Sequence, residues 1–380
     1  MGTLFMLAFA ALAARSVDVT LLRTGGEAAL EPLAANDTMP AMQRRPIVDR
    51  NGVLLAANLP TVSLYADARR VPQPAKQAEK LAAVLPDLSA ADAAAKLASG
   101  KSFIWIKRHL TPVEHHKVNA LGVPGLSFQP AQRRIYPHGP LLAHVLGATD
   151  IDNRGIAGIE QYFDAALDDP ARGGEPLALT IDLRVQHAVR DEMQRAITRH
   201  KALGGGALVL DARSGEIVAL VSLPDFDPAV FEGPEAARFN RITQGSYELG
   251  SALKTLTAAM ALDAGVVGPE GGYDASTPIK IGRFTISEIG DQLRDMVAAS
   301  LLTLETAFGA AKMALDVGAE GQRAFLDRMG LLRRPTLQLP ELSAPQVPRN
   351  WREIETMTIG FGHGLAVSPL QLANAVAALV

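Results

Sequence analysis

The feature that most restricts the fold of this chain is a predicted β-hairpin at residues 207–224, which read ALVLDARSGEIVALVSLP. Two runs rich in Val, Leu and Ile flank the segment Ala212-Arg213-Ser214-Gly215. Such runs on both sides of a short turn containing glycine are typical of paired antiparallel strands. The triplet Gly204-Gly205-Gly206 separates the hairpin from the segment that precedes it.

Helical patterns lie on both sides of this hairpin. Asp182 is placed to cap a helix that continues to about His200, and the apolar residues of this helix recur at helical spacing. They are Leu183, Val185, Val189, Met193 and Ile197. From about residue 250 onward the pattern is again mostly helical. A helix, a β-hairpin and a second helical stretch together predict an α+β domain that begins near residue 175.

Length and composition indicate more than one domain and exclude several functions. A chain of 380 residues exceeds the usual size of one domain, and its 48% apolar and 20% charged residues are typical of globular proteins. The net charge of −3 gives no indication of nucleic-acid binding. Basic clusters such as Gln43-Arg44-Arg45 are expected to lie on a solvated surface. Because cysteine is absent, disulfides, thiolate metal sites and cysteine nucleophiles are excluded.

The N-terminal region opens with an apolar run, Leu4 to Ala14. This run is shorter than the ~20 residues of a bilayer-spanning helix and lacks the basic segment of a secretory signal. We interpret residues 1–16 as the distal end of a membrane helix. The alternative is a short buried helix in a soluble protein. Residues 17–43, with Gly25-Gly26 and several Ala and Pro, are expected to be a spacer.

Residues 44–174 are predicted to form a separate module of mixed structure. Asn51-Gly52, between two short apolar runs, predicts a hairpin or strand pair. Residues 74–98 carry helix-forming residues interrupted at Pro86 and predict two short helices. Residues 127–164 predict an extended segment, a short helix around Leu141 to Leu146, and then a Gly-rich loop.

A candidate nucleophile lies in the stretch YELGSALKTLTAAMAL, where Ser251 precedes Lys254 by three residues. A seryl hydroxyl needs an adjacent base to become nucleophilic. Three residues along a helix place both side chains on one face, with Cβ atoms ~5–6 Å apart. Burial of Lys254 in this mostly apolar helix would favour the neutral amine that can accept the proton. Gly250 would allow a substrate to approach the backbone closely. The alternative is a helix with an ordinary serine near its start.

The surrounding sequence resembles the class B penicillin-binding proteins, and more closely the cell-division D,D-transpeptidases of the FtsI type. The stretch FNRITQGSYELGSALKTLTAAMALDAG resembles their active-site region with its S-x-x-K motif. Five other stretches resemble further landmarks of the family in the same order. They are RRPIVDRNGVLLAAN, RRIYPHGPLLAHVLGATDIDNRGIAGIEQYFD, GGALVLDARSGEIVALVSLPDFDP, YDASTPIKIGRFTISE and GFGHGLAVSPLQLANAVAAL. The resemblance covers about residues 44–380.

The resemblance implies a chemistry. Ser251 would attack the D-Ala-D-Ala amide of a peptidoglycan stem peptide, with Lys254 as general base. D-Ala would leave, and an amine of a neighbouring stem would take the acyl group, which makes a cross-link. β-Lactams would acylate the same serine. No metal and no organic cofactor would be required.

The resemblance also implies an architecture and a location. Residues 44–174 would form an elongated mixed α/β pedestal of the dimerisation type. Residues 175–380 would form a transpeptidase domain with an antiparallel sheet flanked by helices, incomplete because its C-terminal strands are missing. The protein would cross the bacterial inner membrane once and work in the periplasm at the division septum. Its partners would be a glycan polymerase and other division proteins, with the membrane bound through the N-terminal helix.

Two motifs depart from the family pattern. Where the family has Ser-x-Asn, this chain has Glu305 and Ala307. Glu305 adds a negative charge that favours the ammonium form of Lys254 and weakens it as a base, and the Ala307 side chain can neither donate nor accept a hydrogen bond. No Lys-Thr-Gly or Lys-Ser-Gly follows before Val380. In the family that motif supplies a donor of the oxyanion hole.

These departures keep a second hypothesis open, a catalytically impaired penicillin-binding-like scaffold of the division machinery. A third, a β-lactam sensor or β-lactamase relative, is disfavoured by the long N-terminal module.

Histidines provide two further candidates. His363, in Phe361-Gly362-His363-Gly364, is interpreted as part of a turn near the site rather than as a catalytic base. Gly362, His363 and Gly364 are expected to lie close to the substrate. The neighbouring Glu114, His115 and His116 suggest a metal only superficially, because adjacent side chains in a regular element point to different sides.

Overall fold

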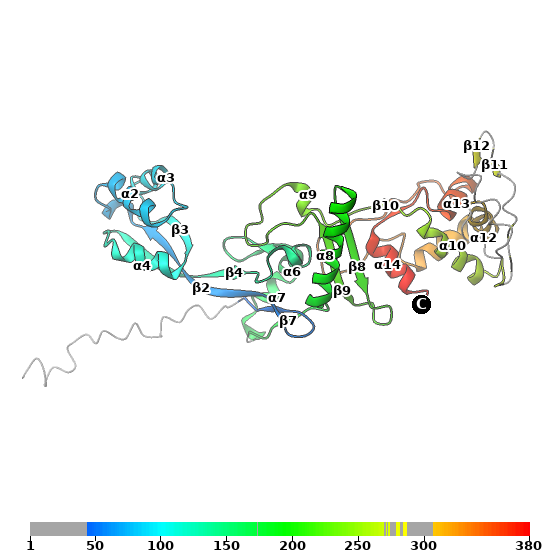
Figure 1. Cartoon of the computed structure of the whole chain (residues 1–380), viewed down its shortest axis with the longest axis horizontal. Coiled ribbons are helices and arrows are strands. Elements are labelled where there is room, and N and C mark those ends of the chain that lie inside the picture. The colour runs from blue at the N-terminus through cyan, green and yellow to red at the C-terminus, as the bar shows by residue number, and fades with distance from the viewer. Residues whose placement is uncertain are drawn as a thin grey trace, which may run out of the picture. The chain divides into compact units, whose positions relative to one another are not determined.

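The computed structural model describes residues 44–172, 174–269, 271, 273, 279–281, 284–286 and 307–380 (Figure 1). Residues 44–380 cluster into one unit and residues 1–43 into another. The predicted membrane helix at residues 1–16 and the predicted spacer at residues 17–43 lie outside the described residues. In the part of the chain that is described, no helix has both the length and the apolar character that a membrane crossing requires.

The first sheet is built around one long strand, β2 (Leu54–Ala66). Strands β1 (Ile47–Val48), β3 (Ile104–Leu110) and β4 (Leu126–Ile135) all pair antiparallel to β2. Strand β7 (Leu177–Ala178) runs parallel to β1.

The predicted hairpin at Asn51-Gly52 is confirmed. In its turn the Asp49 carboxylate accepts hydrogen bonds from the backbone N–H groups of Asn51 and Val53, both at 2.8 Å. Gly52 has a φ of +82°, in the left-handed region that glycine adopts without strain.

Helices cover the part of this sheet that contains β3 and the C-terminal end of β2. They are α2 (Pro74–Val84), α3 (Ala90–Leu97) and α4 (Pro112–Ala120), with a 3₁₀ turn, η2, at Ala68–Arg70. The prediction of two short helices broken near Pro86 is therefore confirmed. Fully buried leucines of the helices and strands share one core, which includes Leu64, Leu81, Leu97 and Leu110.

The segment after β4 contains more regular structure than predicted. The short helix is confirmed as the 3₁₀ turn η3 (Gly139–Leu142) followed by α5 (Ala143–Leu146). The predicted Gly-rich loop instead contains a two-stranded ladder and two helical turns. These are β5 (Ala148–Thr149), β6 (Gly155–Ala157), α6 (Gly158–Tyr162) and α7 (Asp164–Leu167), followed by η4 (Pro170–Arg172). Gly147 allows this packing, because a Cβ there would lie 1.9 Å from the Ala157 carbonyl oxygen.

The expectation that Arg44 and Arg45 lie on a solvated surface is wrong, since their exposed fractions are 3% and 6%. The Arg44 guanidinium binds the fully buried Glu160 carboxylate at 2.8 Å, and Arg134 binds its other oxygen at 2.7 Å. Arg44 also contacts Asp164 and Asp168. Paired charges of this kind are the form in which ionised side chains are tolerated in a protein interior.

The C-terminal region, from about residue 175, begins with the predicted helix and hairpin, and both are confirmed. Helix α8 (Leu183–His200) is capped by Asp182, whose carboxylate accepts a hydrogen bond from the Arg184 backbone N–H. It packs against β8 (Gly205–Leu210) and β9 (Ile217–Leu223), which pair antiparallel (Figure 1). The buried Gln186 side chain bonds both the N–H and the carbonyl of Leu220 and so attaches the helix to β9.

The remaining described chain is mostly helical, as predicted. It contains α9 (Glu235–Arg238), α10 (Ala252–Asp263), α12 (Ala307–Arg328), α13 (Glu353–Gly360) and α14 (Pro369–Ala377). Short ladders join β10 (Tyr247–Glu248) to β13 (Ala366–Val367) and β11 (Ile279–Ile281) to β12 (Phe284–Ile286). The core of this region gathers Leu253, Leu256, Met260, Phe325, Leu331 and Ile359.

Candidate active site

Ser251 occupies the N-cap position of α10 with helical backbone angles, φ −58° and ψ −18°. The residue is exposed, and its hydroxyl makes no capping hydrogen bond to the described helix. Gly250 precedes it with a φ of +54°, a conformation in which a residue with a side chain would be strained. The left-handed glycine therefore turns the chain sharply into α10 and leaves the hydroxyl at the exposed end of the helix.

Lys254 lies one helical turn after Ser251. Its backbone N–H donates to the Ser251 carbonyl at 3.2 Å, so the two residues belong to the same first turn. The sequence-based expectation was a buried lysine, but Lys254 is half-buried. Leu253 and Leu256, both buried, hold the opposite face of α10 against the core formed with α12 and α13.

The turn that follows α13 lies directly against the turn that carries Ser251. The Gly250 N–H donates to the Gly362 carbonyl at 3.0 Å. Gly362 is buried with a φ of +100°, and a Cβ on it would lie 1.9 Å from the Gly250 carbonyl oxygen. The structure thus brings the turn of Gly362, His363 and Gly364 against Gly250, which directly precedes Ser251 in the chain.

A carboxylate joins the same two turns. Glu248 accepts a hydrogen bond from the Gly364 N–H at 2.8 Å, and its other oxygen lies 3.3 Å from Nδ1 of His363. The Gly364 N–H and, to a lesser extent, the His363 ring hold the pKa of the Glu248 carboxyl below its usual range. The carboxylate is therefore ionised at neutral pH. His363 is an exposed partner of this carboxylate.

Thr257 makes a further connection between α10 and α13. Its buried hydroxyl donates to the Gly360 carbonyl at 2.8 Å and contacts the Leu253 carbonyl at 3.3 Å. Sequence reasoning missed both Glu248 and Thr257. Glu248 lies three residues before the predicted nucleophile, and this position was a signal that it could lie near the site. Its partner, the Gly364 N–H, is 116 residues away in the sequence.

The remaining candidates either lack a described side chain or have structural partners elsewhere. Glu305 lies outside the described residues, and Ala307 is the first residue of α12, without a described side chain. Glu114 caps α4 and binds Lys107, while His115 packs edge-to-face on Phe128. No group of three potential metal ligands occurs within the described ranges.

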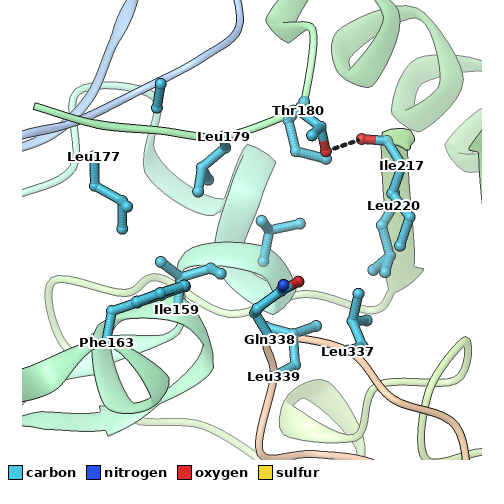
Figure 2. Close-up of a pocket in the computed structure, with 13 residues that line it drawn as sticks. Ile159, Phe163, Leu177, Leu179, Thr180, Ile217, Leu220, Leu337, Gln338 and Leu339 are labelled. Atoms are coloured by element: carbon cyan, nitrogen blue, oxygen red, sulfur yellow. Dashed lines mark hydrogen bonds between the residues drawn. The ribbon is translucent and has the colours of Figure 1, made fainter. Parts of the chain in front are cut away.

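An apolar cavity of about 230 Å³ lies elsewhere in the fold (Figure 2). Side chains from β7, β9, α6 and the segment 337–339 line it, and none of them is a predicted site residue. Its Thr180 hydroxyl already donates to the Ile217 carbonyl at 2.7 Å. Its lining contains no titratable base, and the predicted pair Ser251 and Lys254 lies outside it.

Replacing Gly362 by alanine is expected to disturb the site directly. The new Cβ would overlap the Gly250 carbonyl and take up a strained φ, so the turn before Ser251 must move. A displacement of about 1 Å at a reacting group can cost about 10²-fold in rate. For the acylation by β-lactams that the resemblance implies, we expect a rate lower by about that factor, measured with a fluorescent penicillin.

The matched control for this prediction is Gly268→Ala. Gly268 follows α10, has no positive φ and has open space at its Cβ position. A Gly362→Ala protein that is acylated as fast as the Gly268→Ala protein would contradict the close packing of the two turns.

Comparisons with known proteins give family matches over most of the chain. Residues 40–173 match the penicillin-binding protein dimerisation domain, and residues 205–380 match the penicillin-binding protein transpeptidase domain. The chain is 35% identical over 343 residues to the probable peptidoglycan D,D-transpeptidase FtsI of Caulobacter vibrioides, covering 89% of this chain and 57% of the relative. It is 34% identical over 379 residues to the probable peptidoglycan D,D-transpeptidase PenA of Neisseria meningitidis (91% and 64%). It is 29% identical over 370 residues to the peptidoglycan D,D-transpeptidase FtsI of Escherichia coli (88% and 62%). The chain therefore spans about three fifths of the length of these relatives.

Proposed function

The chain belongs to the penicillin-binding proteins that join a dimerisation domain to a transpeptidase domain, and we propose that it cross-links peptidoglycan stem peptides in cell division through a seryl acyl-enzyme. The observation that carries this proposal is the exposed hydroxyl of Ser251 at the start of α10, one turn before Lys254. Relatives named as peptidoglycan D,D-transpeptidases, similar over most of this chain, support the choice of reaction.

In the proposed reaction Ser251 Oγ attacks the carbonyl carbon of the penultimate D-Ala of a stem peptide. Lys254 Nζ acts as the general base and accepts the hydroxyl proton. The C–N bond to the terminal D-Ala then breaks, and the proton passes to the departing amine. An amine of a second stem attacks the resulting ester, releases Ser251 and forms the cross-link. A β-lactam would follow the first half of this path and remain as an ester.

The helix geometry favours the charge that develops in this reaction. The first turn of α10 carries the partial positive charge of the helix N-terminus, and Ser251 lies in that position. Donors and dipoles fixed toward a developing oxyanion are a major source of catalytic stabilisation. The anchored turn at Gly250 and Gly362 keeps the hydroxyl in place before the substrate arrives.

The remaining assignments extend the same proposal. We assign residues 44–174 to the pedestal and 175–380 to the transpeptidase domain, which the matched ranges 40–173 and 205–380 support. The protein is proposed to be anchored in the inner membrane by its N-terminal segment and to act at the septum with a glycan polymerase and other division proteins. Neither a metal nor an organic cofactor takes part in the proposed chemistry.

Glu305 and Ala307 favour one alternative, a penicillin-binding-like scaffold without turnover. The two functions differ in D-Ala release. A stem pentapeptide ending in D-Ala-D-Ala is expected to lose its terminal residue in the presence of the protein, whereas a control peptide ending in D-Ala-L-Ala is not. Penicillin should block the release. Absence of D-Ala release together with absence of penicillin labelling would overturn the enzymatic proposal in favour of the scaffold.

A further inference from the structure

Glu248 lies on β10, three residues before Ser251, in a segment whose backbone is fixed at several points. Tyr247 and Glu248 pair with Val367 and Ala366 of β13. Two residues later, the Gly250 N–H donates to the Gly362 carbonyl. The turn of residues 361–364 connects α13 to β13, and its Gly362 lies against Gly250.

The Glu248 side chain makes two further contacts with the turn of residues 361–364. One oxygen accepts from the Gly364 N–H at 2.8 Å, and the other lies 3.3 Å from His363 Nδ1. Gly364 has a φ of +87°, in the left-handed region that glycine adopts without strain, and lies two residues before β13. The Gly364 N–H lies outside the short β10–β13 ladder, and the Glu248 carboxylate is its hydrogen-bond acceptor.

Exposure limits what this contact contributes to global stability. The side chains of Glu248 and His363 are 51% and 60% exposed, and exposed ion pairs contribute little to folding because solvent screens them. The buried core under α10, with Leu253, Leu256 and Ile359, holds the domain together without it. A contact that is weak for folding but located three residues from the nucleophile can still determine where the nucleophile lies.

We propose that Glu248 is a positioning residue for the acylation step: its carboxylate fixes the Gly364 turn against the strand that leads into Ser251. This inference rests on the proposed function. Glu248 does not exchange protons with the substrate. It acts through the backbone of residues 362–364 and of Gly250, so that Ser251 Oγ is held at one place relative to Lys254.

The proposal predicts that loss of Glu248 affects the acylation step and not the initial binding of the β-lactam. If Glu248 only orients the nucleophile, its loss lowers the rate constant of acylation within the bound complex, since orientation contributes to the barrier. The non-covalent affinity for the β-lactam stays nearly the same. A glutamine keeps an amide oxygen that can accept from the Gly364 N–H, so it should rescue most of the effect. An alanine cannot accept any hydrogen bond.

The test compares Glu248→Ala, Glu248→Gln and His363→Ala by stopped-flow measurement with a fluorescent penicillin. We expect Glu248→Ala to lower the acylation rate constant by about 10-fold, with the dissociation constant of the initial complex within about 2-fold of wild type. Glu248→Gln should lose less than about 3-fold, and so should His363→Ala, because it removes only the longer contact. An unchanged rate constant in Glu248→Ala, or a change confined to the dissociation constant, would overturn the proposal.

A second measurement separates this proposal from the proposed function. Hydrogen exchange at the Gly364 amide needs no substrate, and we expect it to be at least about 10-fold faster in Glu248→Ala, with an unchanged melting temperature. Unaltered exchange at Gly364 would contradict the positioning role, as would a loss of melting temperature that accounts for the slower acylation. A wild-type protein that is not acylated would instead contradict the proposed function, whatever the exchange result.

Discussion

Replacing Ser251 by alanine is expected to abolish covalent labelling by a fluorescent penicillin and to lower D-Ala release by at least about 10³-fold. The alanine side chain lacks the oxygen that forms the ester, and loss of a catalytic nucleophile is among the largest single effects known in enzymes. The fold should be unaffected, because Ser251 is exposed and does not cap α10. Labelled protein is measured by gel fluorescence at saturating penicillin.

The matched control for Ser251 is Thr255→Ala. Thr255 lies one turn further along α10, is also exposed and also carries a hydroxyl. We expect this variant to be labelled like the wild type. Labelling that persists in the Ser251→Ala protein would place the nucleophile elsewhere in the chain.

Replacing Glu160 by glutamine is expected to produce the largest loss of stability in the pedestal. Glu160 is fully buried between Arg44 and Arg134. Among the described residues, Arg134 has no other carboxylate within ion-pair distance, so the variant would leave an uncompensated guanidinium in the interior. Removing one partner of a buried ion pair typically costs about 3–5 kcal/mol. The free energy of local unfolding should fall by that amount.

Hydrogen exchange of the β2–β4 amides measures this local free energy, since Asn58 and Arg134 face each other in that ladder. A decrease of about 3–5 kcal/mol corresponds to at least about 100-fold faster exchange. Glu79→Gln serves as control, because Glu79 is an exposed residue of α2. A Glu160→Gln protein that exchanges like the control would show that the buried cluster does not stabilise the module.

Elements whose signals are local were predictable from the sequence. The Asn51-Gly52 hairpin, the capped helix after Asp182 and the hairpin of β8 and β9 each depend on residues within a few positions of one another. The burial of Arg44 was not predictable, because its partner Glu160 lies 116 residues away. Without knowledge of Glu160, a basic pair next to a spacer is expected to be exposed to solvent.

The same distinction applies to the candidate site. Ser251 and Lys254 were predicted from their spacing of one helical turn together with the resemblance of the surrounding stretches to a known family. The contacts of Glu248 and Thr257 join positions 116 and 103 residues apart. Their partners are backbone groups of Gly364 and Gly360, and a backbone group has no signature in the sequence. The sequence likewise does not show why position 362 requires glycine, because the Gly250 carbonyl that a Cβ would overlap is distant in the sequence.

Mapping the site of penicillin attachment by mass spectrometry tests the central claim most directly. Cleavage after Arg241 and Lys254 yields the peptide ITQGSYELGSALK, which contains both Ser246 and Ser251. Fragmentation distinguishes the two serines, and the Ser246 hydroxyl is buried without a hydrogen-bond partner in the described structure. We predict that the penicilloyl group is found on Ser251. Attachment at Ser246, attachment in another peptide, or no attachment at saturating penicillin would contradict the assignment of the start of α10 as the reactive centre.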